Sequence, residues 1–70
     1  PVATQDFIQV VNTIKSRGAA VLIVTHDLLC AHQLADRIGI MKQGHLTDLI
    51  TTQSLTLDQV TQRYFDQFAA

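Results

Sequence analysis

The sequence has few of the residues that cross-link or bend small proteins. Among its 70 residues there are one cysteine, one proline, three glycines and no tryptophan. Because Cys30 is the only cysteine, an internal disulfide is excluded, and a reducing compartment is favoured. No internal repeat or low-complexity stretch is present. With 47% hydrophobic residues, the chain is not disordered by composition.

Charge and long apolar runs are also scarce. Charged residues make up 16% of the chain, and the formal net charge is −1. Because the basic residues are scattered, we expect no nucleic-acid partner. The longest apolar run is far below the ~20 residues of a membrane-spanning helix. The segment from Pro1 to Asp6 lacks the basic and apolar regions of a signal peptide, and without an initiator Met we expect the chain to begin within a longer protein.

The most informative segment is residues 20–27. Five consecutive apolar residues, Ala-Val-Leu-Ile-Val, are followed by Thr25, His26 and Asp27. The apolar run predicts a strand over residues 20–25 that is buried on both faces. Since ligands bind at the carboxyl ends of strands in open parallel α/β sheets, His26 is the candidate functional residue.

Helices are predicted on both sides of this strand. The first covers residues 3–16 and ends before Gly18, and its apolar stripe consists of Phe7, Val10, Val11 and Ile14. The second covers residues 28–36, with Asp27 as its cap. Its inner face consists of Leu28, Ala31, Leu34 and Ala35. We expect Cys30 to be a small apolar residue of this helix, and His32 and His45 to face solvent.

The second half of the chain predicts two strands and a helix. Residues 38–41 form an apolar strand, and strand, helix, strand at this spacing predicts a parallel βαβ unit. Gln43-Gly44 then predicts a tight turn into an antiparallel strand over residues 45–50. After a polar link at 51–54, Thr56 and Gln59 form a capping-box pattern. The stripe of the last helix consists of Leu57, Val60, Tyr64 and Phe68, widened by Phe65.

These elements do not suffice to bury the strand at residues 20–25. Parallel strands are rarely stable outside a covered sheet of several strands. The order helix, strand, helix, strand, hairpin strand, helix therefore predicts the trailing part of a larger doubly wound α/β domain. By itself, the chain is expected to dimerise, to exchange elements between copies or to remain partly molten, because it leaves apolar surface open.

Residues 21–27, Val-Leu-Ile-Val-Thr-His-Asp, resemble the switch-histidine region (H-loop) of ATP-binding-cassette (ABC) ATPases, which have a P-loop NTPase fold. The resemblance continues in register through Ala31, Leu-Ala-Asp-Arg-Ile at 34–38, and Met-Lys-Gln-Gly-His-Leu at 41–46. Pro1, followed by a helix, resembles the proline that closes the family's D-loop. The resemblance implies that residues 1–50 are the C-terminal part of the ATPase core and residues 51–70 a variable helical tail.

The resemblance implies a role for three residues. His26 matches the histidine that reaches the γ-phosphate of ATP and helps to position the attacking water and the catalytic carboxylate. An imidazole can donate a hydrogen bond to a phosphate oxygen while neutral near pH 7, and phosphoryl transfer depends mainly on such positioning. Asp27 follows it in the family's pattern and is expected to cap the next helix. Pro1 matches the edge of a loop at the interface of two ATPase domains.

The seventy residues contain no G-x-x-x-x-G-K-[ST] loop, glutamine loop, LSGGQ-type signature or acidic pair ending a strand. We therefore expect the fragment alone neither to bind ATP in the family's manner nor to hydrolyse it, and to need no cofactor. The complete protein would use ATP and Mg²⁺. A metal site from His26, Cys30 and His32 is disfavoured, because these side chains would point in different directions. A His-Asp metal phosphohydrolase would need further ligands from several helices.

For the complete protein, the resemblance implies the ATP-binding subunit of an ABC transporter. It would couple ATP hydrolysis to transmembrane transport, pair with a second ATPase domain, and lie in the cytoplasm against membrane-spanning subunits at the inner face of the membrane. Two alternatives remain: a non-catalytic α/β interaction fragment, and a piece of a soluble ABC ATPase outside transport. A phosphate loop encoded upstream of Pro1 would favour the ATPase. A start codon immediately before Pro1 would favour the interaction fragment.

Overall fold

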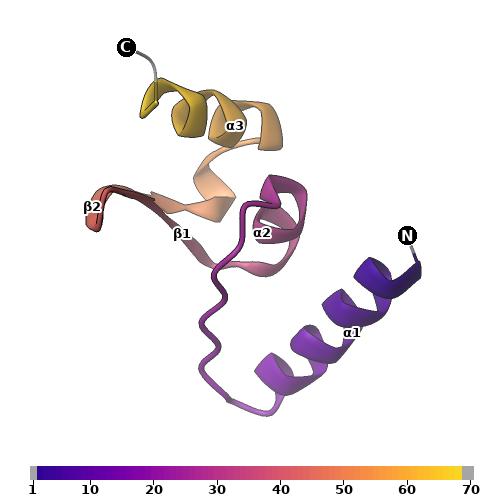
Figure 1. The fold of residues 1–70 in the computed structure, drawn as a ribbon. Coiled ribbons are helices and arrows are strands. Elements are labelled where there is room, and N and C mark those ends of the chain that lie inside the picture. The colour runs from indigo at the N-terminus through magenta and orange to yellow at the C-terminus, as the bar shows by residue number, and fades with distance from the viewer. Residues whose placement is uncertain (1, 69–70) are drawn as a thin grey trace. The chain divides into compact units, whose positions relative to one another are not determined.

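The computed structural model describes residues 2–68 of the chain, and the side chains of residues 5–68 (Figure 1). Its elements are α1 (Val2–Ser16), α2 (Leu28–Leu34), β1 (Arg37–Lys42), β2 (His45–Thr51), the 3-10 helix η1 (Thr52–Ser54) and α3 (Leu57–Asp66). Residues up to Leu34 form one compact unit, and residues from Ala35 form a second. No helix within residues 2–68 is long and apolar enough to cross a membrane.

The first unit contains α1 and α2. Helix α1 ends as predicted at Gly18, whose φ of +88° suits glycine and whose N–H donates to the carbonyl oxygen of Lys15 at 2.9 Å. The Lys15 ammonium in turn donates to the carbonyl oxygen of Leu34, at the end of α2, over 2.5 Å. A basic side chain at this position satisfies one of the carbonyl groups that a helix end leaves without an intrahelical partner.

The core of the first unit is narrower than the predicted stripe. It consists of Val11, Cys30 and Leu34, with Ile8 packed against them. The other three members of the predicted stripe are exposed: Phe7 is 45% exposed, Val10 56% and Ile14 40%. The prediction of a broad buried face on α1 is therefore wrong. A seven-residue helix such as α2 covers only a small part of a fifteen-residue helix, whereas a sheet would cover its whole face.

The predicted strand at residues 20–25 is not formed. The segment is extended and runs alone between α1 and α2 (Figure 1), and within residues 2–68 only β1 and β2 form a sheet, with each other. Leu22 and Val24 are 93% and 94% exposed, so the expected burial is also wrong. A strand needs neighbours that accept and donate its backbone hydrogen bonds, and this segment has no neighbouring strand in the described part of the chain.

The second unit contains a hairpin. Strands β1 and β2 are antiparallel, with Ile38 opposite Ile50 and Lys42 opposite His45. The turn between them has φ values of +51° at Gln43 and +82° at Gly44, as in a type I′ turn. The predicted strand, turn and antiparallel return are thus confirmed. The parallel βαβ unit is wrong, because β2 is the only strand that pairs with β1 in residues 2–68.

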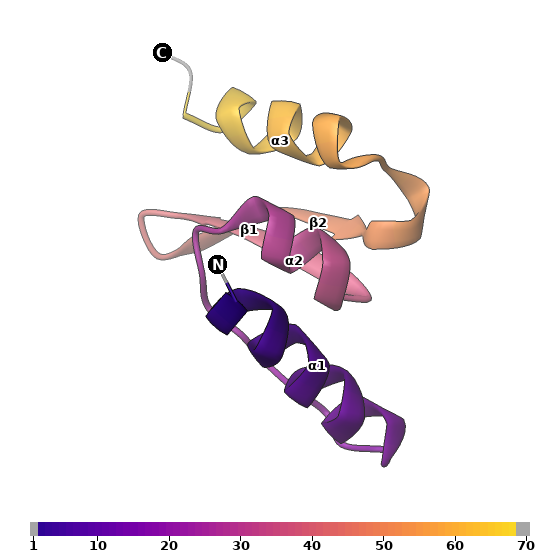
Figure 2. The same ribbon diagram turned by 90° about the vertical axis from the view of Figure 1, so that its right-hand side faces the viewer.

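Helix α3 runs alongside the hairpin (Figure 2). The predicted capping box is confirmed: the Gln59 N–H donates to Thr56 Oγ1 at 3.2 Å, and the Thr56 N–H donates to Gln59 Oε1 at 2.8 Å. Val60 of the predicted stripe is fully buried. Three hairpin residues are almost fully buried as well: Ile38, Ile40 and Ile50. The outer part of the stripe is not buried, since Phe65 is 60% exposed and Phe68 lies beyond the end of the helix.

The observed order is helix, helix, strand, strand, helix rather than the predicted alternation of strands and helices. The chain is a small α/β structure with a two-stranded antiparallel sheet. Its compact units divide after Leu34, so α3 belongs with the hairpin. The division at residue 50, which the family resemblance implies, stays a prediction.

Candidate functional site

The turn at residues 25–27 links the extended segment to α2 through hydrogen bonds of its own side chains. Thr25 Oγ1 accepts from the Asp27 N–H at 3.0 Å, and Asp27 Oδ1 accepts from the Cys30 N–H at 3.0 Å. The Asp27 carbonyl oxygen also accepts from the Ala31 N–H at 3.0 Å. Asp27 is therefore the cap of α2, as predicted from the sequence.

His26 lies at the bend between these two residues, and its side chain is exposed. Thr25 and Asp27 both use their side chains inside the turn. No described residue forms a hydrogen bond with the imidazole of His26. Both ring nitrogens are consequently available to an external partner, one as a donor and one as an acceptor in the neutral ring. The arrangement can offer a hydrogen bond to an oxygen of a ligand while the turn fixes the backbone of the histidine.

The other sequence-predicted residues do not join His26. Pro1 lies outside the described residues. Cys30 is a free, buried cysteine in the core of the first unit, as expected. His45 is exposed as predicted, whereas His32 is half-buried rather than on the solvent side of α2. Within the described residues, no three His, Cys, Asp or Glu side chains are grouped so that they could hold a metal ion.

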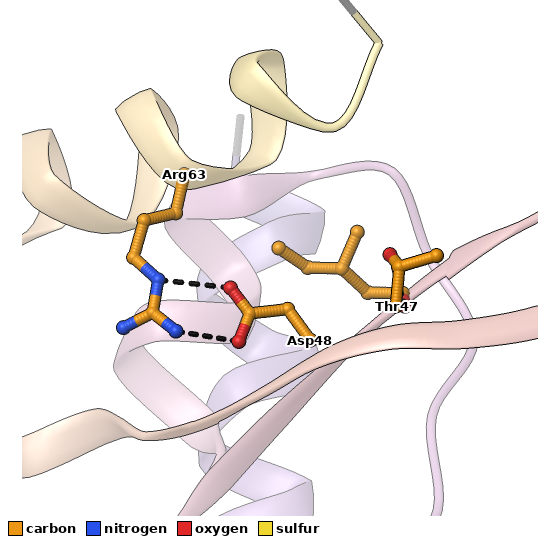
Figure 3. A network of polar contacts seen from close by, with 4 residues as sticks. Thr47, Asp48 and Arg63 are labelled. Atoms are coloured by element: carbon orange, nitrogen blue, oxygen red, sulfur yellow. Dashed lines mark hydrogen bonds and ion pairs between the residues drawn. The ribbon is translucent and has the colours of Figure 1, made fainter.

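A polar contact that the sequence did not indicate joins α3 to the hairpin (Figure 3). Arg63 Nε donates to Asp48 Oδ2 at 2.8 Å, and Arg63 Nη2 donates to Asp48 Oδ1 at 2.5 Å. Next to it, Thr47 Oγ1 donates to the carbonyl oxygen of Ile40 at 3.1 Å, where the register of the hairpin is irregular. Fifteen residues separate the two charged groups, so no helical or strand periodicity relates them. Because each charge satisfies the other, this pair is structural rather than a free binding group.

Comparison with known proteins gives similarity in sequence only. No family model matches the chain, and no solved structure matches it. The chain is 29% identical over 63 residues to the methionine import ATP-binding protein of Haemophilus ducreyi. The matched residues are 89% of this chain and 18% of that protein. The chain is also 33% identical over 58 residues to a ribose import ATP-binding protein of Streptomyces coelicolor, covering 83% of this chain and 11% of that protein.

A third similar protein, from Pyrococcus horikoshii, carries the name of an ABC transporter ATP-binding protein. It is 33% identical over 42 residues, which are 60% of this chain and 16% of that protein. The chain thus spans between 11% and 18% of the length of these three relatives. All three names agree with the resemblance seen in the sequence, and the chain is similar to a segment of ABC transporter ATP-binding proteins.

Proposed function

We propose that the chain is the C-terminal portion of the ATP-binding subunit of an ABC transporter, beginning just after the D-loop, and that His26 is its switch histidine. The observation that carries this proposal is the imidazole of His26: exposed, without a hydrogen-bond partner among the described residues, and placed at a bend that Thr25 and Asp27 hold in shape. The order of the surrounding motifs supports it, as does the similarity to import ATP-binding proteins over most of the chain.

His26 fits one part of the chemistry of such a subunit. An exposed imidazole can donate to an oxygen of the terminal phosphate of ATP, and holding that group and its attacking water in position lowers the barrier of phosphoryl transfer. The seventy residues offer no phosphate loop, and no described cluster of carboxylates suits Mg²⁺. ATP and Mg²⁺ would therefore be held mainly by the rest of the protein, with His26 contributing a single contact.

The complete protein would act with partners. Import ATP-binding proteins supply energy to transport, so the complete subunit would associate with membrane-spanning transporter subunits at the cytoplasmic face of the membrane and pair with a second ATPase domain. Pro1 would lie at the interface of the two ATPase domains, and Asp27 would keep the histidine turn at the start of α2.

The test is His26→Ala in the complete ATP-binding subunit. We expect ATPase turnover to fall by about 10²-fold or more, the size of effect seen when a positioned hydrogen-bonding or proton-transferring group is removed. ATP affinity, measured by equilibrium binding, should change by less than about threefold, because the remaining phosphate contacts are elsewhere in the protein.

His45→Ala is the matched control, since His45 is also exposed but lies beside the hairpin turn. It should leave both turnover and ATP affinity unchanged. Full turnover in the His26→Ala subunit would refute the switch assignment.

A further inference from the structure

Helices α2 and α3 both begin at a capping residue, but the N–H of that residue is satisfied in different ways. In α3, the Thr56 N–H donates to the side chain of Gln59, the third residue of the helix. The third residue of α2 is Cys30, which is a weak acceptor and lies in the core of the first unit. The N–H of the capping Asp27 donates instead to Thr25 Oγ1 at 3.0 Å. A bond to the residue two positions earlier thus replaces the reciprocal half of a capping box.

This hydrogen bond closes a ring across His26, because its donor and its acceptor are the residues on either side. Two further bonds anchor Asp27 at the start of α2: its Oδ1 accepts from the Cys30 N–H, and its carbonyl oxygen accepts from the Ala31 N–H, both at 3.0 Å. The backbone of His26 is therefore held between a helix start and the hydroxyl of Thr25, while the histidine side chain stays exposed. A reacting group is placed accurately only when the backbone that carries it is fixed.

We propose that Thr25 is a positioning residue for His26, because its hydroxyl fixes the backbone from which the imidazole would reach the terminal phosphate of ATP. This inference rests on the proposed function of His26. The bond from Asp27 uses only the side chain of Thr25, so the backbone N–H and C=O of Thr25 stay available to a neighbouring strand in the complete subunit. All three bonds lie within residues 25–31, so they need no surface from the rest of the protein.

The test is Thr25→Val in the complete ATP-binding subunit, since valine keeps the branched shape of threonine but lacks its acceptor. We expect ATPase turnover to fall by about threefold to tenfold, because one hydrogen bond that holds the histidine is lost. The KM for ATP and the equilibrium ATP affinity should stay within about twofold, because the hydroxyl acts on the histidine and not on the nucleotide. Thr25→Ser keeps the hydroxyl, and its turnover should stay within about twofold of the original. Full turnover in Thr25→Val, or an equal loss in both variants, would overturn the proposal.

Thr56→Val is the matched control, because Thr56 Oγ1 also accepts a backbone N–H at the start of a helix, from Gln59 at 3.2 Å. Its turnover should stay within about twofold of the original, since α3 belongs to the other compact unit. Amide hydrogen exchange locates the two effects: Thr25→Val should speed exchange at Asp27, and Thr56→Val at Gln59. An equal loss of turnover in Thr56→Val would show general destabilisation instead of positioning, and the proposal would be wrong.

A double-mutant cycle separates this inference from the proposed function. In a His26→Ala background, Thr25→Val should change turnover by less than about twofold, because no imidazole is left to position. If Thr25→Val lowers turnover as much there as in the original subunit, Thr25 acts independently of His26, and the inference fails while the switch assignment stands. If His26→Ala alone keeps full turnover, the switch assignment itself fails, and the inference fails with it.

Discussion

At the scale of single residues, the environment of His26 is set by its two neighbours. Thr25 accepts from the Asp27 N–H, and Asp27 accepts from the Cys30 N–H, so both side chains serve the turn and neither competes for the imidazole. A histidine held in this way has a fixed backbone and a free side chain. This difference agrees with the cap role of Asp27 and supports the proposed functional role of His26.

Asp27→Ala should therefore act on α2 rather than on a ligand. Loss of the cap leaves the Cys30 N–H without its partner and should destabilise the helix by about 1 kcal/mol, within the 0.5–2 kcal/mol typical of such caps. Hydrogen exchange of the Cys30 and Ala31 amides measures the effect. Asp27→Asn is the control, because its side-chain oxygen can still accept, and it should retain most of the protection. Equal protection in Asp27→Ala and the original chain would contradict the cap.

Gly44 is the residue that permits the hairpin turn. Its φ of +82° is costly for any residue with a Cβ, and Gly44→Ala should destabilise the hairpin by about 1–2 kcal/mol. Gln43→Asn should act in the opposite direction, because Asn-Gly is the preferred pair for a type I′ turn and φ is +51° at this position. Exchange protection of the amides in β1 and β2 reports both effects. An unchanged hairpin in Gly44→Ala would show that the turn does not need positive φ there.

At the scale of elements, the segments whose structure depends on local chemistry form as the sequence predicts. The capping box at Thr56 and the Gln43-Gly44 turn form as predicted, because each is decided by hydrogen bonds or dihedral angles within a few residues. The strand at residues 20–25 does not form, because strand formation depends on partners far along the chain or outside it. The exposed positions in the α1 stripe have the same cause, since burial requires a surface to pack against.

In the described part of the chain, two polar contacts join α3 to the hairpin: the Asp48–Arg63 pair, and a hydrogen bond from Lys42 Nζ to the carbonyl oxygen of Gln67 at the end of the helix. The carboxylate of Asp48 is 16% exposed and the Arg63 side chain 43%, so solvent screens the pair and its contribution should be about 0.5–1 kcal/mol. A double-mutant cycle with Asp48→Ala and Arg63→Ala, read from exchange protection of the amides in α3, measures this coupling energy. Gln62→Ala is a control on the same helix, at an exposed position. A coupling energy of zero would show that the pair does not hold the helix.

At the scale of the whole molecule, the chain consists of two compact units that divide after Leu34. It carries a candidate phosphate-contacting histidine without the loop that would bind the phosphates. We therefore expect no saturable binding when Mg-ATP is titrated into the 70-residue chain up to about millimolar concentration, since one hydrogen bond contributes only about 0.5–1.5 kcal/mol. Isothermal calorimetry and the NMR shifts of the His26 ring measure this. Saturable binding at micromolar ATP would contradict the absence of a phosphate site.

The sequence by itself determined the features that rest on near neighbours and on residue identity. These are the helix end at Gly18, the cap at Asp27, the hairpin turn, the capping box of α3, and the resemblance that singles out His26. Only the tertiary structure decided which apolar residues are buried, that residues 20–25 stay unpaired, and that Asp48 meets Arg63. The physical reason is that turns and caps are satisfied within a few residues, whereas a strand and a buried face require surfaces that composition and periodicity do not supply.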